Sequence, residues 1–286
     1  MTTADWMKEC WDHIKSREIW RVILPGTHNS GVFSAWNTIG VRNQDKNIGE
    51  QLDGGIRAFD IRVMKGHGTY VMHHDVYYPP DDSQHLIPAL DQIAAFVAAH
   101  DHEVLVINLS AGAGSDLTVD DYPGVRQTVL DRLESKLIAW NPYGSYTLES
   151  IHATGKNIVL ISAIGKEPGK EVLFWDAGED FMKSTWDGFQ SDFWITPDEK
   201  IGRLKPHVYD GLRNPPKRFL WADCEIWTIN IYNAASAWTN PNLPSWFKEW
   251  ASDSQASGAM NIFGVDFFEA PDNQIVNTIV ALNGAR

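Results

Sequence analysis

The stretch "ILPGTHNSGVFSAW", residues 23–36, contains the first strand signal of the chain and its first polar turn. Its opening residues complete an apolar run, "WRVIL" at 20–24, which enters a Pro-Gly pair, and His28 follows among small polar residues. Such residues at the end of a strand leave room for a backbone to approach a ligand. A lone histidine after a strand is more often structural than catalytic. Its role therefore depends on the polar residues that accompany it elsewhere.

Outward from this stretch, strand-like apolar runs alternate with amphipathic segments. The strand-like runs are short, β-branched or aromatic, and apolar enough to be buried on both faces. They occupy residues 20–26, 56–64, 69–74, 103–110, 157–165, 227–233 and 261–268, and helical periodicity marks 89–101, 125–140 and 271–283. The alternation has no Gly-rich dinucleotide fingerprint and predicts an α/β fold, a distorted TIM (β/α) barrel that spans residues 1–286 as a single domain. A doubly wound open sheet is the alternative, and the irregular stretch 166–214 is expected to form long loops at one rim.

Composition narrows the class of protein. With 286 residues, 43% of them hydrophobic and 12% aromatic, the chain can bury a large core. The net charge of −13 argues against a nucleic-acid partner, because a phosphate backbone requires a basic surface. Cys10 and Cys224 lie far apart and form no metal-binding spacing, which leaves a disulfide between them open.

The sequence does not indicate in which compartment the protein acts. The chain shows neither a signal peptide nor an apolar run of about eighteen residues. The compartment stays open between secretion, with a leader already removed, and the cytoplasm.

Polar residues stand at the predicted strand ends, where a barrel carries its active site. His28 follows the first strand, Asp60 and Arg62 lie in "AFDIRVM", His74 ends "YVMHH", and Asp266 lies in "FGVDFF". Charges inside buried strands are costly unless paired, and the alternation of a strand points Asp60 and Arg62 to the same face. Two imidazoles, an arginine and two carboxylates suit acid–base chemistry on a phosphate ester.

Each of these residues also has a structural explanation when it is taken alone. Asp60 and Arg62 could form a buried ion pair, and Asp266 could cap the following helix. His73, the first histidine of "YVMHH", is expected to be structural. The coincidence of all the others at strand ends favours a catalytic site.

The ordered motifs resemble those of a known family. "LPGTHNSG", "GGIRAFDIR" and "YVMHHD" resemble the X-box of bacterial phosphatidylinositol-specific phospholipase C, and "NIYNAASAWTNPNLPSW" with "FGVDFFE" resembles its C-terminal part. The resemblance covers most of the chain. It implies a distorted TIM barrel that cleaves phosphatidylinositol without a cofactor or metal. The inositol 2-hydroxyl would attack the phosphorus, giving diacylglycerol and inositol 1,2-cyclic phosphate.

Carried over residue by residue, the resemblance implies a role for each strand-end group. His28 would be the general base, held by Asp266, and His74 the general acid that protonates the leaving oxygen. Arg62 would stabilise charge on the phosphate, and Asp60 would orient Arg62 or His74. In-line displacement requires such a base and acid on opposite sides of phosphorus, with a fixed cation beside it.

Other positions depart from the bacterial pattern. Asn29 stands in the catalytic motif where the bacterial enzymes usually carry Asp, as it does in calcium-dependent eukaryotic relatives. Ser110 and Ala163 stand where the family places a lysine and an arginine near phosphate or inositol. Asp192 and Trp194 are the candidates for the family's substrate-contacting Asp and stacking Tyr, and Ser110 is a further substrate-binding candidate.

Membrane contact is the last expectation from the resemblance. Trp36 and Trp238 occupy positions similar to the rim tryptophans that insert into bilayers, and ordinary loop packing is the alternative. The implied partner is a phospholipid at a membrane surface, bound peripherally by a monomer.

Two other function classes remain in play. One is a metal-dependent phosphodiesterase of the same barrel class, such as a glycerophosphodiesterase or a sphingomyelinase D-like enzyme, which requires clustered carboxylates. The other is an inactive phosphoinositide-binding barrel. The presence of both His28 and His74 argues against the second. Arg62, placed where calcium-using relatives carry an acidic ligand, argues against the first.

Overall fold

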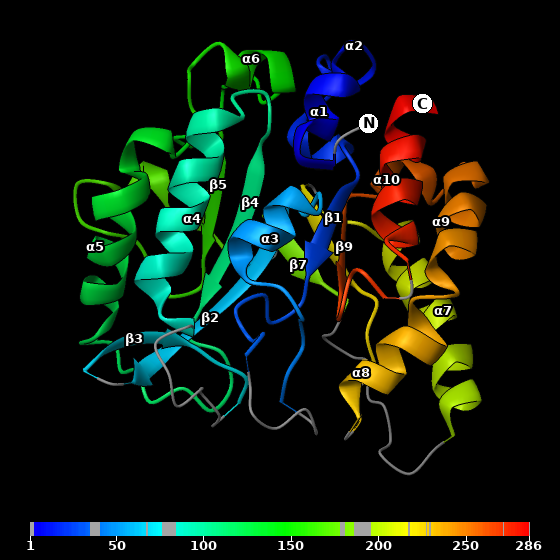
Figure 1. Ribbon diagram of the computed structural model, residues 1–286. Helices are drawn as coiled ribbons and strands as arrows, with labels where there is room; N and C mark the ends of the chain where they lie inside the picture. The colour runs from blue at the N-terminus through cyan, green and yellow to red at the C-terminus, as the bar shows by residue number, and fades with distance from the viewer. Residues whose placement is uncertain are drawn as a thin grey trace.

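The computed structural model describes residues 3–34, 41–66, 68–75, 84–177, 181–185, 196–216, 218–226, 228, 230–270 and 272–285. Its strands are β1 (Leu24–Thr27), β2 (Ala58–Gly66), β3 (Thr69–Met72), β4 (Leu105–Ser110), β5 (Ile158–Ser162), β6 (Trp175–Asp176), β7 (Met182–Ser184), β8 (Phe219–Asp223) and β9 (Ile262–Val265). They form one sheet in the order β6-β5-β4-β2-β1-β9-β8-β7. All of these pairs are parallel, and β3 is attached antiparallel to β2 (Figure 1).

The strand order makes the sheet a nearly closed barrel. The first strand, β1, pairs with β9, the last strand of the chain, in the register Gly26↔Gly264, so the sheet curls back on itself. Among the described residues β6 and β7 are not paired, and the barrel is open between them. The predicted distorted TIM barrel is confirmed. The doubly wound open sheet is excluded, because the strands follow one another around the ring without a switch in direction.

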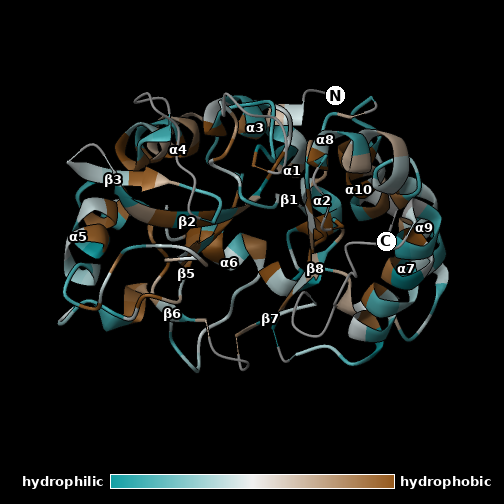
Figure 2. Ribbon diagram, turned by 90° about the horizontal axis from the view of Figure 1, so that it is seen from below, coloured by the Kyte–Doolittle hydropathy of each residue, from teal (hydrophilic) through white to brown (hydrophobic). Residues whose placement is uncertain are grey.

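Helices lie around the ring of strands and across its amino end (Figures 1 and 2). They are α1 (Trp6–Glu9), α2 (Trp11–Ile14), α3 (Ile48–Asp53), α4 (Leu86–Ala99), α5 (Tyr122–Leu133), α6 (Leu148–His152), α7 (Pro197–Arg213), α8 (Ile231–Asn233), α9 (Leu243–Ser252) and α10 (Gln274–Ala285). Short 3₁₀ turns are η1 (Thr3–Asp5), η2 (Ile19–Arg21), η4 (Glu134–Lys136), η5 (Glu171–Leu173) and η7 (Ser257–Ala259), and η6 (Ala234–Thr239) is π-helical. The connection from β5 to β6 holds only η5 in place of an α-helix, which makes the barrel irregular there.

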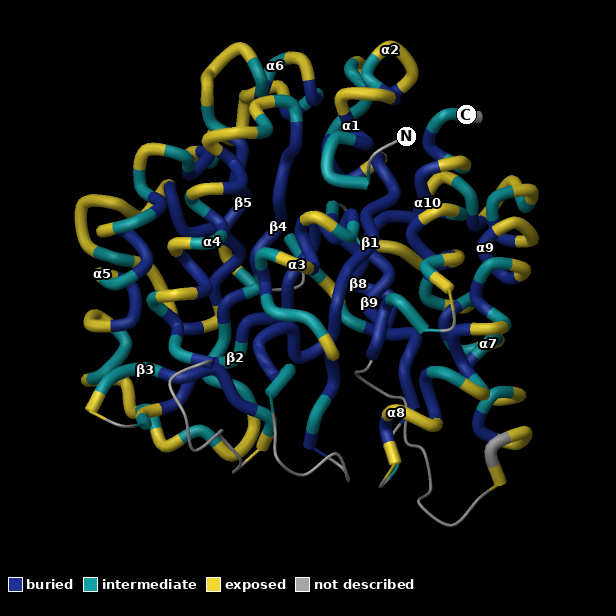
Figure 3. Tube along the Cα trace, in the orientation of Figure 1, coloured by how far each residue is buried: buried dark blue, intermediate teal, exposed yellow. Residues whose placement is uncertain are grey.

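Burial explains why these runs are strands. β5 is buried at every position, and β4 is largely buried, because the barrel interior covers one face and helices cover the other (Figure 3). Inside the barrel, Gly264 of β9 allows the Trp221 indole of β8 to lie across it, since an added Cβ would overlap that ring. Trp221 thereby becomes part of the inner wall near the carboxyl ends of the strands.

The amino end of the barrel is closed by structural charges. Arg57 and Glu103 form a fully buried ion pair of 2.8 Å, and the guanidinium also donates to the carbonyls of Leu52 and Ala4. With its charge and donors paired inside the protein, Arg57 has a structural role.

One predicted strand is wrong. In the stretch 227–233, residues Ile231–Asn233 form helix α8, whose cap is the Asn230 side chain accepting the backbone N–H of Asn233 at 3.0 Å. The strand of this region is instead β8, at Phe219–Asp223. Both runs are short and apolar, and periodicity does not separate a short buried strand from a helical turn.

Two other predictions are corrected in their bounds. The stretch 166–214 is not all loop, because α7 occupies Pro197–Arg213 behind a capping box of Thr196 with Glu199. The run 20–26 begins in the 3₁₀ turn η2, and β1 starts only at Leu24.

Two further findings concern the cysteines and membranes. Cys10 and Cys224 are both buried free thiols. In the described part of the chain no helix is both long and apolar enough to span a bilayer.

Candidate active site

The first motif forms a tight turn at the carboxyl end of β1. Asn29 adopts φ 44°, a left-handed conformation that asparagine tolerates. The Ser30 hydroxyl accepts from the backbone N–H of Asp60, and the Asn29 N–H donates to the Asp60 carboxylate at 3.1 Å. These bonds fasten the turn to β2, and the His28 N–H fastens it to β9 by donating to the Val265 carbonyl at 3.0 Å. His28 is therefore held rigidly between two strands.

His28 forms a triad with Asp266 and Asn43. Its Nδ1 lies 3.0 Å from Asp266 Oδ1, and Asn43 Nδ2 donates to the same oxygen at 2.9 Å. All three residues are buried. A carboxylate on Nδ1 fixes the ring orientation and leaves Nε2 for proton transfer.

Arg62 and Asp60 form the second unit of the site. The guanidinium Nη2 lies 2.9 Å from Asp60 Oδ2, and Asn108 Nδ2 contacts the other carboxylate oxygen at 3.4 Å. Burial opposes ionisation of Asp60, but Arg62, His28 and the Asn29 N–H outweigh it and lower its pKa. Burial likewise opposes the Arg62 charge, while Asp60 and other carboxylates outweigh it and raise the Arg62 pKa. The pair is charged, and Arg62 presents a fixed cation.

His74 faces His28 across a gap. Its Nδ1 lies 2.9 Å from the Val41 carbonyl, which makes Nδ1–H the donor and leaves Nε2 for the cavity. The two ring centroids are 6.3 Å apart, and the rings are steeply inclined at 75°. Burial, followed by repulsion from His28, lowers the pKa of His74. Two imidazoles at this separation can serve the two ends of one phosphodiester.

These groups border two adjoining cavities. One, of about 190 Å³, is lined by His28, His74, Arg62 and Asp266, with Ile226, Thr228 and Ile231 among the residues of its wall. The other, of about 250 Å³, is lined by Asp60, Asn108, Ser110, Ser184, Trp221 and Asp223. Arg62 lines both cavities. A phosphate held by Arg62 would thus have space on either side.

Known proteins resemble this chain in sequence and in fold. No protein-family model matches the chain. A curated relative, the 1-phosphatidylinositol phosphodiesterase of Staphylococcus aureus strain Newman, is 22% identical over 191 residues, which is 63% of this chain and 53% of the relative. The chain therefore matches about half the length of that relative.

Solved structures match along nearly the full chain. The phosphatidylinositol-specific phospholipase C of Listeria monocytogenes superposes with a TM-score of 0.73 at 16% identity, covering 99% of both chains. A Staphylococcus aureus phosphatidylinositol-specific phospholipase C gives 0.70 at 19% identity, covering 99% of this chain and 98% of the other. The fold is that of bacterial phosphatidylinositol-specific phospholipase C. The resemblance inferred from the motifs is confirmed at this level.

The structure brings the predicted strand-end residues together. His28, Arg62, His74 and Asp266 line one cavity, with Asp60 bound to Arg62. Asn29 stands behind the cavity wall, where its side-chain Nδ2 donates to Asn43 Oδ1 at 3.2 Å. Ser110, one of the two residues that stand where the family has a lysine or an arginine, lines the second cavity.

Other predicted residues lie elsewhere. Trp238 is half-buried and packs against the main core. His73 is structural as expected, since its Nε2 lies 2.7 Å from the Ala111 carbonyl. Trp36, Asp192 and Trp194 lie outside the described residues.

Sequence reasoning missed Asn43, Asp223 and Glu225. Asn43 lies in a polar stretch without strand or helix periodicity, and nothing in its neighbours pointed to the site. Asp223 and Glu225 stand in "FLWADCEIW", at the end of β8. Two acids after an apolar run are a usable signal, but the predicted strand at 227–233 begins eight residues after the start of β8.

Possible metal ligands do not converge here. In the described ranges, the grouping of His, Cys, Asp and Glu side chains able to hold an ion is Asp101, His102 and His152, which is separate from both cavities.

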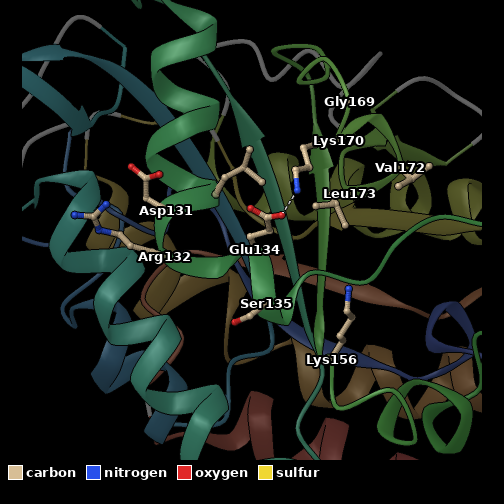
Figure 4. Close-up of a pocket in the computed structure, with 10 residues that line it drawn as sticks. Asp131, Arg132, Glu134, Ser135, Lys156, Gly169, Lys170, Val172 and Leu173 are labelled. Carbon is tan, nitrogen blue, oxygen red and sulfur yellow. Dashed lines mark hydrogen bonds and ion pairs between the residues drawn. The ribbon is translucent and has the colours of Figure 1, made fainter.

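A wider hollow of about 650 Å³ lies on the outside of the barrel, between the end of α5 and the loop before β6 (Figure 4). Its wall contains an ion pair of Lys170 with Glu134, while Arg132 pairs with Asp91 at 3.2 Å. None of the strand-end groups lines it. The smaller cavities at the carboxyl ends are therefore the candidate active site.

Proposed function

We propose that this chain is a metal-independent phosphatidylinositol-specific phospholipase C, a phosphorus–oxygen lyase that acts at a membrane surface. One observation carries the proposal: a carboxylate-bound His28, an opposing His74 and the fixed cation Arg62 line a single cavity. The match to solved phosphatidylinositol-specific phospholipases C over the whole chain supports it.

The reaction follows from the two histidines. His28 Nε2 takes the proton of the inositol 2-hydroxyl, whose oxygen attacks phosphorus. The bond from phosphorus to the diacylglycerol oxygen breaks, and that oxygen takes the proton that His74 Nε2 carries. The products are inositol 1,2-cyclic phosphate and diacylglycerol, and the histidines end with their protonation states exchanged. Asp266 stabilises the imidazolium that forms on His28.

Arg62 stabilises the phosphate during attack. Its guanidinium offers parallel N–H donors to the non-bridging phosphate oxygens. The ion pair with the Asp60 carboxylate fixes the orientation of the guanidinium. Because the cation is a side chain, it does not depart with product. The charge that a metal supplies in other phosphodiesterases is here assigned to Arg62.

The second cavity suits a polyol headgroup. Ser110, Ser184 and Asn108 supply hydroxyl and amide groups along its wall, and Trp221 supplies an aromatic face. Such a lining recognises hydroxyls rather than additional phosphates. We assign the 2-hydroxyl edge of the inositol ring to His28 in the first cavity and the rest of the ring to this second cavity, with Arg62 between them. The lipid oxygen lies on the side of His74.

The membrane contact and a monomeric state belong to the same proposal. The partly exposed Trp238, close behind α8, is the described candidate for an interfacial anchor.

Purified protein tests the function directly. Vesicles of phosphatidylinositol, phosphatidylcholine or sphingomyelin are incubated with the protein in EDTA, and release of diacylglycerol or ceramide and of cyclic phosphate is measured. We expect cleavage of phosphatidylinositol alone. His28→Ala should reduce its rate by about 10²-fold or more. The matched control is His13→Ala, an exposed histidine of α2 at the opposite end of the barrel. Near-normal turnover by H28A would refute the mechanism, and turnover that requires Ca²⁺ or Mg²⁺ would favour the metal-dependent class.

A further inference from the structure

Glu225 is an acidic residue that the mechanism above does not use. It follows β8, is 4% exposed, and lines the same cavity as His28, His74 and Arg62. Neither carboxyl oxygen has a hydrogen-bond partner among the described residues. An unpartnered carboxyl in a protein interior is costly and calls for an explanation at a functional site.

No described residue supplies a hydrogen-bond partner for this carboxyl. Glu225 Oε1 lies 3.8 Å from His28 Nδ1, beyond hydrogen-bond distance, and that nitrogen is already bound to Asp266 at 3.0 Å. The Glu225 carboxyl therefore does not form a second hydrogen bond to His28. Its oxygens border the cavity that a substrate would fill.

The surroundings disfavour the charged form of this carboxyl. Burial, then the Asp223 and Asp266 carboxylates, raise the pKa of Glu225 well above its usual range, against the opposing charge of Arg62. Among the described residues, His28, His74 and Asp75 are the other titratable groups on the cavity wall. A protonated carboxyl offers one donor and one acceptor, which matches an alcohol and does not repel a phosphate anion.

We propose that Glu225 is a substrate-recognition residue that binds a headgroup hydroxyl beside the one that His28 deprotonates. This inference rests on the proposed function and names a further residue for its headgroup. This hydroxyl would donate to one carboxyl oxygen of Glu225 and accept from the other, so both oxygens would gain a partner. The hydroxyl does not react and remains in the cyclic product. As pH rises and Glu225 ionises, the new negative charge repels the phosphodiester and weakens binding.

The test uses a soluble inositol phosphodiester with a nitrophenol leaving group. Nitrophenol departs without a proton, so the loss of the His74 proton does not limit kcat in this assay. For wild type we expect KM to rise toward alkaline pH with kcat nearly constant. Glu225→Ala should raise KM by roughly 3- to 10-fold at neutral pH, the value of one neutral hydrogen bond, and leave kcat within about 3-fold.

Glu225→Gln separates recognition from packing. The amide retains a donor and an acceptor but does not ionise, so KM should stay within about 3-fold of wild type and lose its alkaline rise. Glu149→Gln, an exposed glutamate of α6 at the amino end of the barrel, is the matched control and should keep the wild-type profile.

Three outcomes would overturn the inference. They are an unchanged KM in E225A, a loss confined to kcat, and an alkaline rise that persists in E225Q. If both variants fail to fold, the wild-type profile decides, because a KM independent of pH contradicts an ionisable recognition group. Failure of wild type to cleave phosphatidylinositol would instead refute the proposed function, so the two failures are distinguishable.

Discussion

Replacing Asp266 by asparagine should slow cleavage of phosphatidylinositol by roughly 5- to 30-fold. The structure shows His28 Nδ1 bound to Asp266 Oδ1 at 3.0 Å. A hydrogen bond to a charged group contributes about 1.5–3 kcal/mol and a neutral one about 0.5–1.5 kcal/mol, so losing the charge removes about 1–2 kcal/mol. At about 1.4 kcal/mol per factor of ten, this difference gives the expected range.

Asn43 limits the loss of rate in the Asp266→Asn variant. Its Nδ2 donates at 2.9 Å to the same oxygen that faces His28. In Asp266→Asn, the new amide would therefore keep its oxygen in that place. If the amide rotated, its NH₂ group would face the NH₂ group of Asn43, and the two would repel each other. The imidazole then retains the tautomer in which Nε2 accepts a proton.

The double variant tests this explanation. In Asn43→Ala with Asp266→Asn, the amide can rotate and donate to Nδ1, which moves the ring proton to Nε2 and removes the base. The loss should approach the roughly 10⁴-fold known for the same change in a Ser-His-Asp triad. Initial rates give kcat/KM for each variant, with Asn43→Ala alone as the control. The reasoning is refuted if the double variant is no slower than Asp266→Asn, or if Asp266→Asn loses less than about 2-fold.

Three further predictions concern the acid, the cation and the membrane. His74 must be protonated to act, and its pKa is lowered, so activity on lipid should fall as pH rises through a value below the usual 6.5. The rate with a nitrophenyl substrate should not show this fall, because the leaving group needs no proton. If the assignment is wrong, His74→Ala should slow both substrates equally. Turnover should survive EDTA, and restoration by Ca²⁺ after a loss would make Asn29 and Asp60 metal ligands. Trp238→Ala should weaken binding to phosphatidylinositol vesicles, measured by sedimentation, but leave nitrophenyl turnover nearly intact; equal losses would mean that the indole only packs.

Local patterns in the sequence were sufficient for much of the barrel and for the centre of the site. The apolar runs that became β2, β4, β5 and β9 could be read directly, because strands buried on both faces are continuously apolar. The two-residue spacing of Asp60 and Arg62 predicted a shared face, and their side chains meet at 2.9 Å. Both properties follow from the period of the backbone and require no knowledge of distant contacts.

The runs at 219–223 and 227–233 mark the limit of such patterns. Each is short and apolar, and the strand was assigned to the second when it belongs to the first. The choice depends on which run can pair with β9, and β8 does so in the register Trp221↔Ile262. Pairing between strands is a long-range property that local composition does not encode.

What only the tertiary structure decided is the chemical state of the site. Asn43 and Asp266 are 223 positions apart and meet only because β1 and β9 close the barrel. The same closure removes Glu225 from water and sets it near Asp223 and Asp266. A sequence specifies which groups can ionise, but the desolvation and neighbouring charges that set their pKa values arise only when the chain has folded around them.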